Sequence, residues 1–126
     1  MAGRDGPQTL LLRDQRRALH AYEAVNTVPS EQRKDYKTAV NDLGANILRG
    51  GLCAALATVQ RLGDRGDLLL DHLATAGVPG LESATRHDLV RRVGSLSADA
   101  YMVATREMIQ VATWLKRAVQ ATFGDD

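Results

Sequence analysis

The sequence predicts an all-α protein, a compact bundle of five to six helices in a single domain, and three observations support this fold class. Apolar residues recur at 3.6-residue spacing along most of the chain. No segment alternates apolar and polar residues with β-branched enrichment, and no Asn-Gly pair marks a hairpin. Glycine and proline divide the periodic segments into lengths typical of single helices. With 126 residues, 44% of them hydrophobic, the chain can bury one core without further staples.

We expect residues 1–7 to be a disordered N-terminus, residues 8–123 to form the helical domain and residues 124–126 to be an acidic tail. The first predicted helix covers residues 8 to about 28 and is amphipathic. Its expected apolar side consists of Leu11, Leu12, Ala18, Leu19, Tyr22 and Val25. Its opposite, basic side consists of Arg13, Arg16, Arg17 and His20. Pro29 ends this helix, because the residue before a proline disfavours the helical conformation.

A second helix is predicted to begin near Ser30, whose side-chain oxygen can cap its N-terminus. Its apolar stripe is Tyr36, Ala39, Val40, Leu43 and Ile47. Gly50 and Gly51 each cost roughly 1 kcal/mol relative to Ala in a helix, so the chain is expected to kink or break there. The next helical segment places a third set of apolar residues on one side: Leu52, Ala55, Leu56, Val59 and Leu62.

Gly63 and Gly66 bracket a short turn before a leucine-rich segment that contains Leu68, Leu69, Leu70 and Leu73. The run Gly77-Val78-Pro79-Gly80 is the strongest stop signal in the sequence, and it predicts a loop over residues 77–84. Two more helices follow. Thr85 and Asp88 resemble a capping box for a short helix that ends at Gly94 and buries Leu89, Val90 and Val93.

The last helix gives the clearest pattern, with Ser97 as its N-cap and a periodic stretch that runs to about Thr122. Leu96 and Tyr101 are placed to form a hydrophobic staple across its first turn. Its core stripe consists of Tyr101, Met108, Ala112, Leu115 and Val119.

Composition excludes several classes of protein. Sixteen basic and fifteen acidic residues give a formal net charge of +1, so nucleic-acid binding would require a local patch. The N-terminus has no apolar signal region, and no stretch approaches the roughly 20 apolar residues of a membrane span. The single Cys53 cannot form an internal disulfide, and we expect it to be buried. A cytoplasmic protein is therefore expected.

The sequence offers no constellation for catalysis, metal binding or a cofactor. The glycines between Gly44 and Gly51 lack the lysine of a phosphate-binding loop. His20, His72 and His87 show no metal-ligand spacing. His87 and Asp88 are neighbours, and neighbouring side chains on a helix point about 100° apart. Cys53 lies in an apolar segment without an adjacent cation to activate it. We expect neither an enzyme nor a small-molecule binder.

Two helices concentrate positive charge, and this pattern is compatible with phosphate binding. The first carries the basic side described above. The last places Arg106, Gln110, Thr113 and Arg117 on one face at spacings of four, three and four. An ordinary solvated face, with ion pairs to residues such as Asp14, Glu23 and Glu107, explains the spacing equally well. Trp114 lies at the edge of the apolar face of its helix and is a candidate interface residue.

Several ordered motifs resemble the small-subunit family of the type III-B CRISPR Cmr complex, the fifth Cmr protein. They span about residues 14–123 and match only loosely between Gly63 and Gly94. The motifs are Gln15-Arg16-Arg17-Ala18 leading to Ala21-Tyr22, Ile47-Leu48-Arg49-Gly50-Gly51-Leu52 with Ala55-Leu56, and Ala104-Thr105-Arg106-Glu107 leading to Trp114-Leu115-Lys116-Arg117. Gly50 stands where the family pattern has Asn.

The resemblance implies a non-catalytic, all-helical subunit of an antiviral effector, stacked in several copies beside the guide RNA and the target RNA. Its partners would be the other Cmr subunits, further copies of itself and both RNAs, with no membrane, metal or cofactor. The candidates for RNA or subunit contact are Arg13, Arg16, Arg17, His20, Arg49, Arg106, Lys116 and Arg117. Each arginine in these motifs can instead clamp a helix end or pair with Glu23 or Glu107.

A protein of another class competes with this interpretation. A helical adaptor or oligomerisation module would bind other proteins through an apolar groove and never contact nucleic acid.

Overall fold

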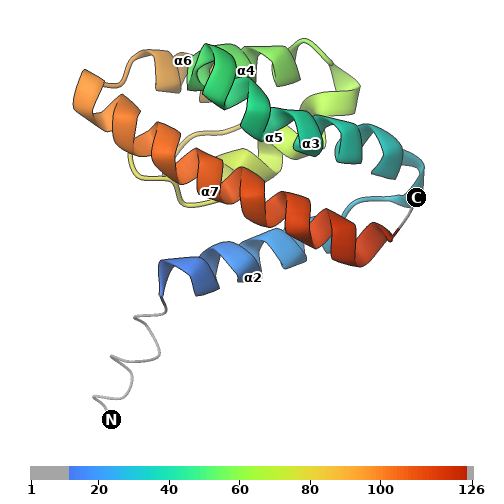
Figure 1. The fold of residues 1–126 in the computed structure, drawn as a ribbon. Coiled ribbons are helices and arrows are strands. Elements are labelled where there is room, and N and C mark those ends of the chain that lie inside the picture. The colour runs from blue at the N-terminus through green and yellow to red at the C-terminus, as the bar shows by residue number, and fades with distance from the viewer. Residues whose placement is uncertain (1–11, 125–126) are drawn as a thin grey trace.

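The computed structural model describes residues 12–124 of the chain (Figure 1). This part contains six α-helices and one 3-10 helix, and it contains no strand. This confirms the predicted all-α bundle. The elements are α2 (Arg13–Asn26), η1 (Ser30–Gln32), α3 (Arg33–Gly50), α4 (Leu52–Gln60), α5 (Asp64–Ala74), α6 (Leu89–Gly94) and α7 (Ala98–Phe123). The expected disordered N-terminus, the predicted first-helix residues 8–11 and the last two residues of the acidic tail lie outside the described residues.

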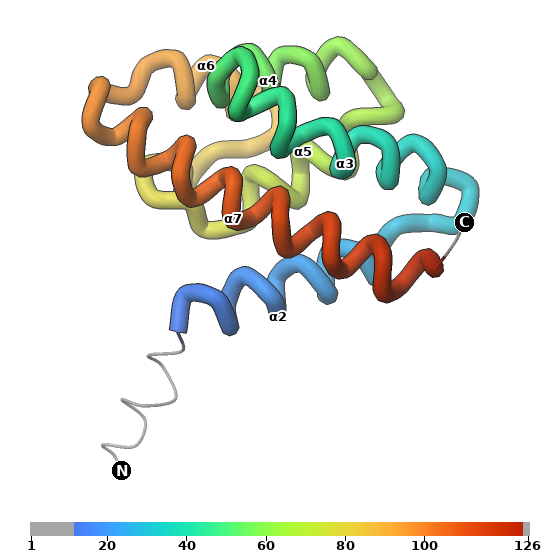
Figure 2. Tube along the Cα trace, viewed as in Figure 1, coloured from blue at the N-terminus to red at the C-terminus, as the bar shows by residue number. Residues whose placement is uncertain are grey.

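The 26-residue helix α7 is the longest element and lies between two parts of the bundle (Figures 1 and 2). One side of α7 packs against α2, and the other packs against α3 and α6. Helix α3 also packs against α4 and α5, and these helices form the larger layer above α7 in the view. Helix α2 makes its main contacts with α7, and it lies at the lower edge of the molecule.

Most of the core is formed by the apolar stripes that the sequence predicts for the second helix onward, and α2 adds Ala21, Ala24 and Val25. All five stripe residues of α3 are buried, as are Leu69, Leu70 and Leu73 of α5. In α7, Met108, Ala112, Leu115 and Val119 are buried, and Tyr101 is half-buried. These stripes are confirmed except at Leu62 and Val90, which are half-buried. Each helix enters the shared core on only one face.

The predicted break after α3 occurs at Gly51, whose φ of 95° is favourable only for glycine. Helix α3 ends at Gly50 and α4 begins at Leu52. The predicted loop over residues 77–84 is also confirmed, although it contributes to the core through the buried side chains of Val78 and Leu81. Cys53, expected to be buried, is only half-buried, and its backbone N–H donates to the Tyr101 hydroxyl at 3.1 Å.

Two predicted helix starts are displaced. Ser30 opens the short helix η1 without a side-chain cap, and α3 begins three residues later at Arg33. The carboxylate of Asp88 accepts the Thr85 backbone N–H at 2.7 Å, as in a capping box, but α6 begins only at Leu89. This hydrogen bond and Arg92 lower the pKa of Asp88 to about 2. The predicted cap of the last helix is confirmed, since Ser97 Oγ accepts from the Ala100 N–H.

The predicted apolar side of the first helix is largely wrong. Leu12 and Leu19 are 71% and 54% exposed, and Tyr22 is also exposed. Val25 is buried as predicted, but the other buried residues of α2 are Arg17, Ala21 and Ala24. The physical reason lies in α7, which offers Arg17 a buried carboxylate, while the small alanines let the two helices pack closely. A buried ion pair therefore displaces the leucines from the interface.

Candidate nucleic-acid interface

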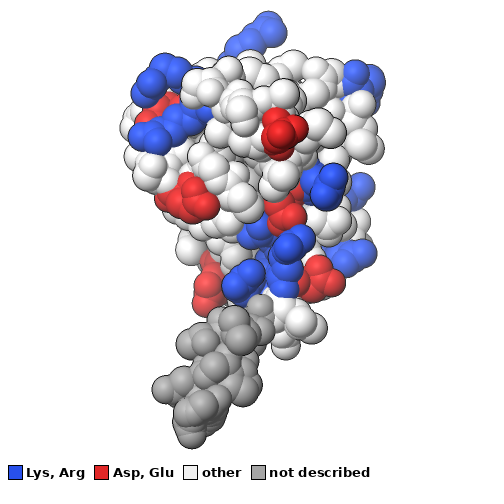
Figure 3. Space-filling view, turned by 90° about the vertical axis from the view of Figure 1, so that its left-hand side faces the viewer, with Lys and Arg blue, Asp and Glu red and all other residues white. Residues whose placement is uncertain are grey.

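A basic cleft, which we call the arginine cleft, lies between α2, α7 and the loop that follows α5. Its volume is about 550 Å³. Its lining residues are Arg13, Arg16, Arg17, Ala76, Gly77, Pro79, Val103, Arg106 and Glu107. The structure thus brings together three candidates from the first helix and one from the last. Figure 3 shows lysine and arginine side chains gathered in the lower part of the face it presents, next to the grey residues.

Glu107 is the acid at the centre of the arginine cleft. Its Oε1 accepts from Arg17 Nη2 at 2.9 Å, and its Oε2 accepts from Arg13 Nη1 at 3.0 Å. Arg17 also donates through Nη1 to the backbone oxygen of Ala76. One carboxylate therefore connects α2 to α7, and Arg17 connects both to the loop.

The arginines of the cleft differ in their accessibility. The side chains of Arg17 and Glu107 are only 8% and 6% exposed, whereas that of Arg13 is 65% exposed. Arg16 and Arg106 are exposed as well. The expectation that Arg17 lies on the outer face is wrong, because its guanidinium is held inside by Glu107 and Ala76. Arg13, Arg16 and Arg106 remain available to a ligand.

The cleft concentrates the positive charge of a nearly neutral chain. Four arginines and one glutamate line it, a formal charge of +3, while the whole chain carries +1. Guanidinium groups present planar forks of N–H donors that match phosphate oxygens. The cleft is therefore suited to a phosphodiester or another polyanion.

The predicted polar face of the last helix extends this charge along α7. Arg106, Gln110, Thr113 and Arg117 are all exposed, as is Lys116. Arg106 and Arg117 are eleven positions apart, which corresponds to roughly 16 Å along the helix. The Arg117 guanidinium lies over the Trp114 ring, 4.9 Å from its centroid, and Trp114 is half-buried. These residues form a track that leads away from the cleft.

Two other candidates lie elsewhere. His20, expected on the outer face, is half-buried with Nε2 3.4 Å from Thr75 Oγ1, and burial is the main cause of its lowered pKa. Arg49 is exposed at the end of α3 and lines a separate depression with Ala54 and Thr58. Neither residue reaches the arginine cleft.

A second basic cleft, of about 550 Å³, lies beside the first half of α3. It is lined by Ser30, Arg33, Lys34, Lys37, Thr38, Asn41 and Phe123. Arg33 lies over the Phe123 ring, 4.9 Å from its centroid. Lysines supply two of its three cations, and a lysine is a point charge without the bidentate fork of arginine. This surface was not predicted from the sequence.

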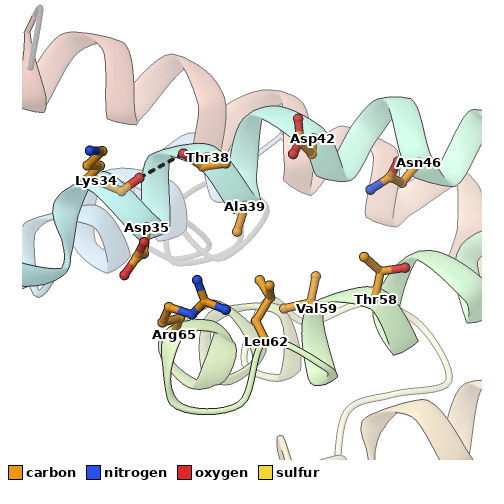
Figure 4. A pocket seen from close by; sticks show the side chains of 10 residues that line it. All are labelled: Lys34, Asp35, Thr38, Ala39, Asp42, Asn46, Thr58, Val59, Leu62 and Arg65. Atoms are coloured by element: carbon orange, nitrogen blue, oxygen red, sulfur yellow. Dashed lines mark hydrogen bonds between the residues drawn. The ribbon is translucent and has the colours of Figure 1, made fainter.

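A smaller pocket of about 170 Å³ lies between α3 on one side and α4 and α5 on the other (Figure 4). Figure 4 shows Asp35 and Arg65 extending toward each other from opposite walls, with Ala39, Val59 and Leu62 between the helices. Two cations, Lys34 and Arg65, are balanced by two acids, Asp35 and Asp42. The charge of this pocket does not favour a polyanion.

His72 is the most strongly perturbed histidine that lies inside the bundle. Its Nδ1 accepts from the Tyr36 hydroxyl at 2.7 Å, and its Nε2 lies 3.1 Å from Thr27 Oγ1, which donates to the backbone oxygen of Ala24. These partners assign a neutral ring with the proton on Nε2. Burial, reinforced by His20, lowers the pKa of His72 to about 4. The arrangement is fully satisfied and structural.

The described part of the chain contains neither a cluster of metal ligands nor a membrane-spanning helix. Within residues 12–124, no three His, Cys, Asp or Glu side chains are grouped closely enough to hold a metal ion. No helix in the same range has the length and hydropathy needed to cross a bilayer.

Pairing of a motif arginine with Glu107 was one of the alternatives that the sequence left open, and Arg17 confirms it, but neither the burial of that pair nor the contribution of the loop was predicted. The spacing alone suggests only that Glu107 pairs with a surface arginine. One signal was present: Glu107 lies three residues after Ala104 and four before Val111, both of which are buried. An acid on that face of a helix needs a buried cation. The contribution of Ala76, Gly77 and Pro79 had no local signal.

Comparisons with known proteins agree on one family. The family model described as "CRISPR-associated protein (Cas_Cmr5)" matches residues 13–122. The crystal structure of a CRISPR-associated Cmr5 family protein from Thermus thermophilus is similar, with a TM-score of 0.77 and 29% sequence identity. The similarity covers 88% of this chain and 97% of that one. No curated protein matches the chain.

Proposed function

Because the chain belongs to the Cas_Cmr5 family and is thereby a subunit of a type III-B CRISPR Cmr complex, we propose that it lines the RNA path of that complex. In this proposal it is a non-catalytic subunit. Several copies stack beside the guide RNA and the target RNA, and each presents arginine side chains to the RNA backbone.

The observation that carries the proposal is the arginine cleft. Arg13, Arg16 and Arg106 are exposed there, and they come from helices that are some 90 positions apart in the sequence. The exposed face of α7 continues from Arg106 to Arg117. A single cleft offers few phosphate contacts, so the isolated chain is expected to bind RNA weakly. Stacked copies would join such clefts into a longer basic track.

The test is charge reversal in a reconstituted complex that contains guide RNA. The double variant Arg16→Glu, Arg106→Glu changes two exposed residues that form no ion pair within residues 12–124, so the free energy of unfolding should change by about half a kcal/mol per site or less. We expect the variant to lower the affinity for target RNA. The slope of log K against log salt should fall by roughly 0.7 for each phosphate of a single strand that is no longer bound.

The control is Arg61→Glu, which makes the same charge change as one of the two substitutions, at an exposed residue outside the cleft lining. It should leave affinity and salt slope close to those of the parent. The proposal is contradicted if the double variant assembles and binds target RNA with the parent's affinity and slope.

A second candidate function is an adaptor that contacts only protein, and the outer face of α2 favours it. Leu12, Leu19 and Tyr22 are exposed there, and Met102 and Val103 are exposed near the start of α7. The same experiment separates the two functions. An adaptor that binds through this apolar face would keep both assembly and RNA affinity in the double variant, whereas an RNA-lining subunit would assemble and lose RNA affinity.

A further inference from the structure

An acid lies within a cleft that is otherwise basic. Glu107 is buried and accepts from two arginines at once, the buried Arg17 and the exposed Arg13. In a surface that only attracts phosphate, an acid at this place would weaken binding by repulsion. Pairing with the buried Arg17 accounts for Oε1 of this carboxylate, but the hydrogen bond from the exposed Arg13 to Oε2 calls for a further role.

We propose that Glu107 is a positioning residue of the arginine cleft, which fixes Arg13 in the orientation that binds an RNA phosphate. This inference rests on the proposed function and assigns different roles to the arginines of the cleft. Arg17 holds the carboxylate, the carboxylate holds Arg13, and Arg13 contacts the ligand.

The first step is that the carboxylate is itself immobile. Arg17 donates to Glu107 Oε1 and to the backbone oxygen of Ala76, and its side chain is more than nine-tenths buried. Glu107 is buried to a similar extent on α7. The second oxygen, Oε2, is thereby presented at a fixed place on the cleft wall.

The second step is that only one nitrogen of the Arg13 guanidinium is anchored. Its Nη1 donates to Glu107 Oε2, while most of its side chain is exposed to solvent. A guanidinium has five N–H donors, so several remain for phosphate oxygens. An anchored side chain loses less rotamer freedom on binding than a free one, and this favours affinity.

The third step sets two effects against each other. Replacing Glu107 by Gln removes a negative charge, which by electrostatics alone strengthens RNA binding. The same change leaves Arg13 without an acceptor, because the amide of Gln can keep its oxygen toward Arg17 but then presents N–H donors toward Arg13. Immobilising one long side chain changes affinity by roughly two- to tenfold. The direction of the measured change therefore distinguishes the effects.

The experiment measures target-RNA binding by complexes that carry Glu107→Gln, with Asp14→Asn as the matched control. Asp14 is exposed, lines the adjoining depression with Arg13, and forms no ion pair with the described residues. Glu107→Gln should weaken binding roughly three- to tenfold and lower the salt slope by about 0.7 per contacting copy. Asp14→Asn should leave binding unchanged or slightly tighter. The inference is overturned if both variants bind RNA equally well or more tightly than the parent.

Two further variants guard against loss of folding and isolate the role of Arg13. Glu107→Gln leaves the guanidinium of Arg17 buried without its counter-charge, which is destabilising. If the single variant does not fold, Glu107→Gln combined with Arg17→Met removes both buried charges and still deprives Arg13 of its anchor, so RNA binding should again weaken. Arg13→Gln should weaken binding, and adding it to Glu107→Gln should cause no further loss. Additive losses would contradict a positioning role.

The outcomes also separate this inference from the proposed function. If Arg16→Glu with Arg106→Glu has no effect on RNA binding, the proposed function fails. If that double variant weakens binding while Glu107→Gln behaves like Asp14→Asn, the proposed function stands and the positioning role fails.

Discussion

At the scale of single residues, buried polar groups determine how this bundle is assembled. Arg17 and Glu107 neutralise each other where α2 meets α7. His72 is enclosed by Tyr36 and Thr27, and a T-shaped contact with Tyr36 places the two ring centroids 5.5 Å apart. A buried polar group is costly when one partner is removed. Both groups thus make the fold specific and sensitive to change.

His72 makes the stability of the protein depend on pH. Its pKa is about 4 in the folded protein, below the ordinary histidine value of 6.5 that applies to the unfolded chain. Below pH 6.5 the unfolded chain therefore binds the proton more strongly than the folded protein does. The free energy of unfolding should fall as the pH drops from about 6.5 to about 4, and this contribution should level off below pH 4. Thermal melts across this range measure the effect.

The control for that prediction is His72→Gln, which cannot titrate. Its thermal midpoint at neutral pH should be lower than that of the parent, because the buried hydrogen bonds of the ring are disturbed. The midpoint should also change less as the pH falls, because Gln does not titrate. Equal pH dependence in both proteins would show that other groups cause it.

At the scale of elements, α2 illustrates why a periodic pattern alone did not identify the buried face. Two apolar arcs occur in this helix. One contains Leu12 and Leu19, and the other contains Ala21, Ala24 and Val25. The predicted apolar side groups Val25 with the leucines. The larger leucines favoured the first arc, but α7 offers a buried acid to Arg17, which lies with the second. Such a choice depends on a residue 90 positions away.

Close approach between α4 and α5 requires a glycine. A Cβ atom at Gly66 would overlap the backbone oxygen of Val59 and press on the side chain of Leu62. Gly66→Ala should therefore lower the free energy of unfolding by about 1 to 3 kcal/mol, the cost of overpacking. Chemical denaturation measures this directly.

Gly44→Ala is the matched control, since a Cβ at Gly44 in α3 meets nothing within 4 Å. The change should raise the free energy of unfolding by roughly 0.5 to 1 kcal/mol, because Ala is the better helix former. If both variants shift stability in the same direction, the close contact at Gly66 is not the deciding factor.

At the scale of the whole molecule, the architecture was easier to predict from the sequence than the site. All six described helices contribute to one core, and for α3 to α7 most of the apolar stripe could be identified locally. The exposed arginines of α2 and α7 were identified as candidates, but nothing local indicated that these helices pack side by side around Glu107. The cleft arises from contacts between distant segments. Helix periodicity carries no information about such contacts.

The central claim is that the arginine cleft faces RNA in the assembled complex. The most direct measurement is photocrosslinking of a target RNA that contains 4-thiouridine, followed by mapping of the crosslinked peptides of this subunit. We expect crosslinks to residues 13–17 of α2 and 103–107 of α7. Crosslinks confined to residues 33–37 of the second basic cleft, or absent from this subunit while other subunits are crosslinked, would contradict the claim.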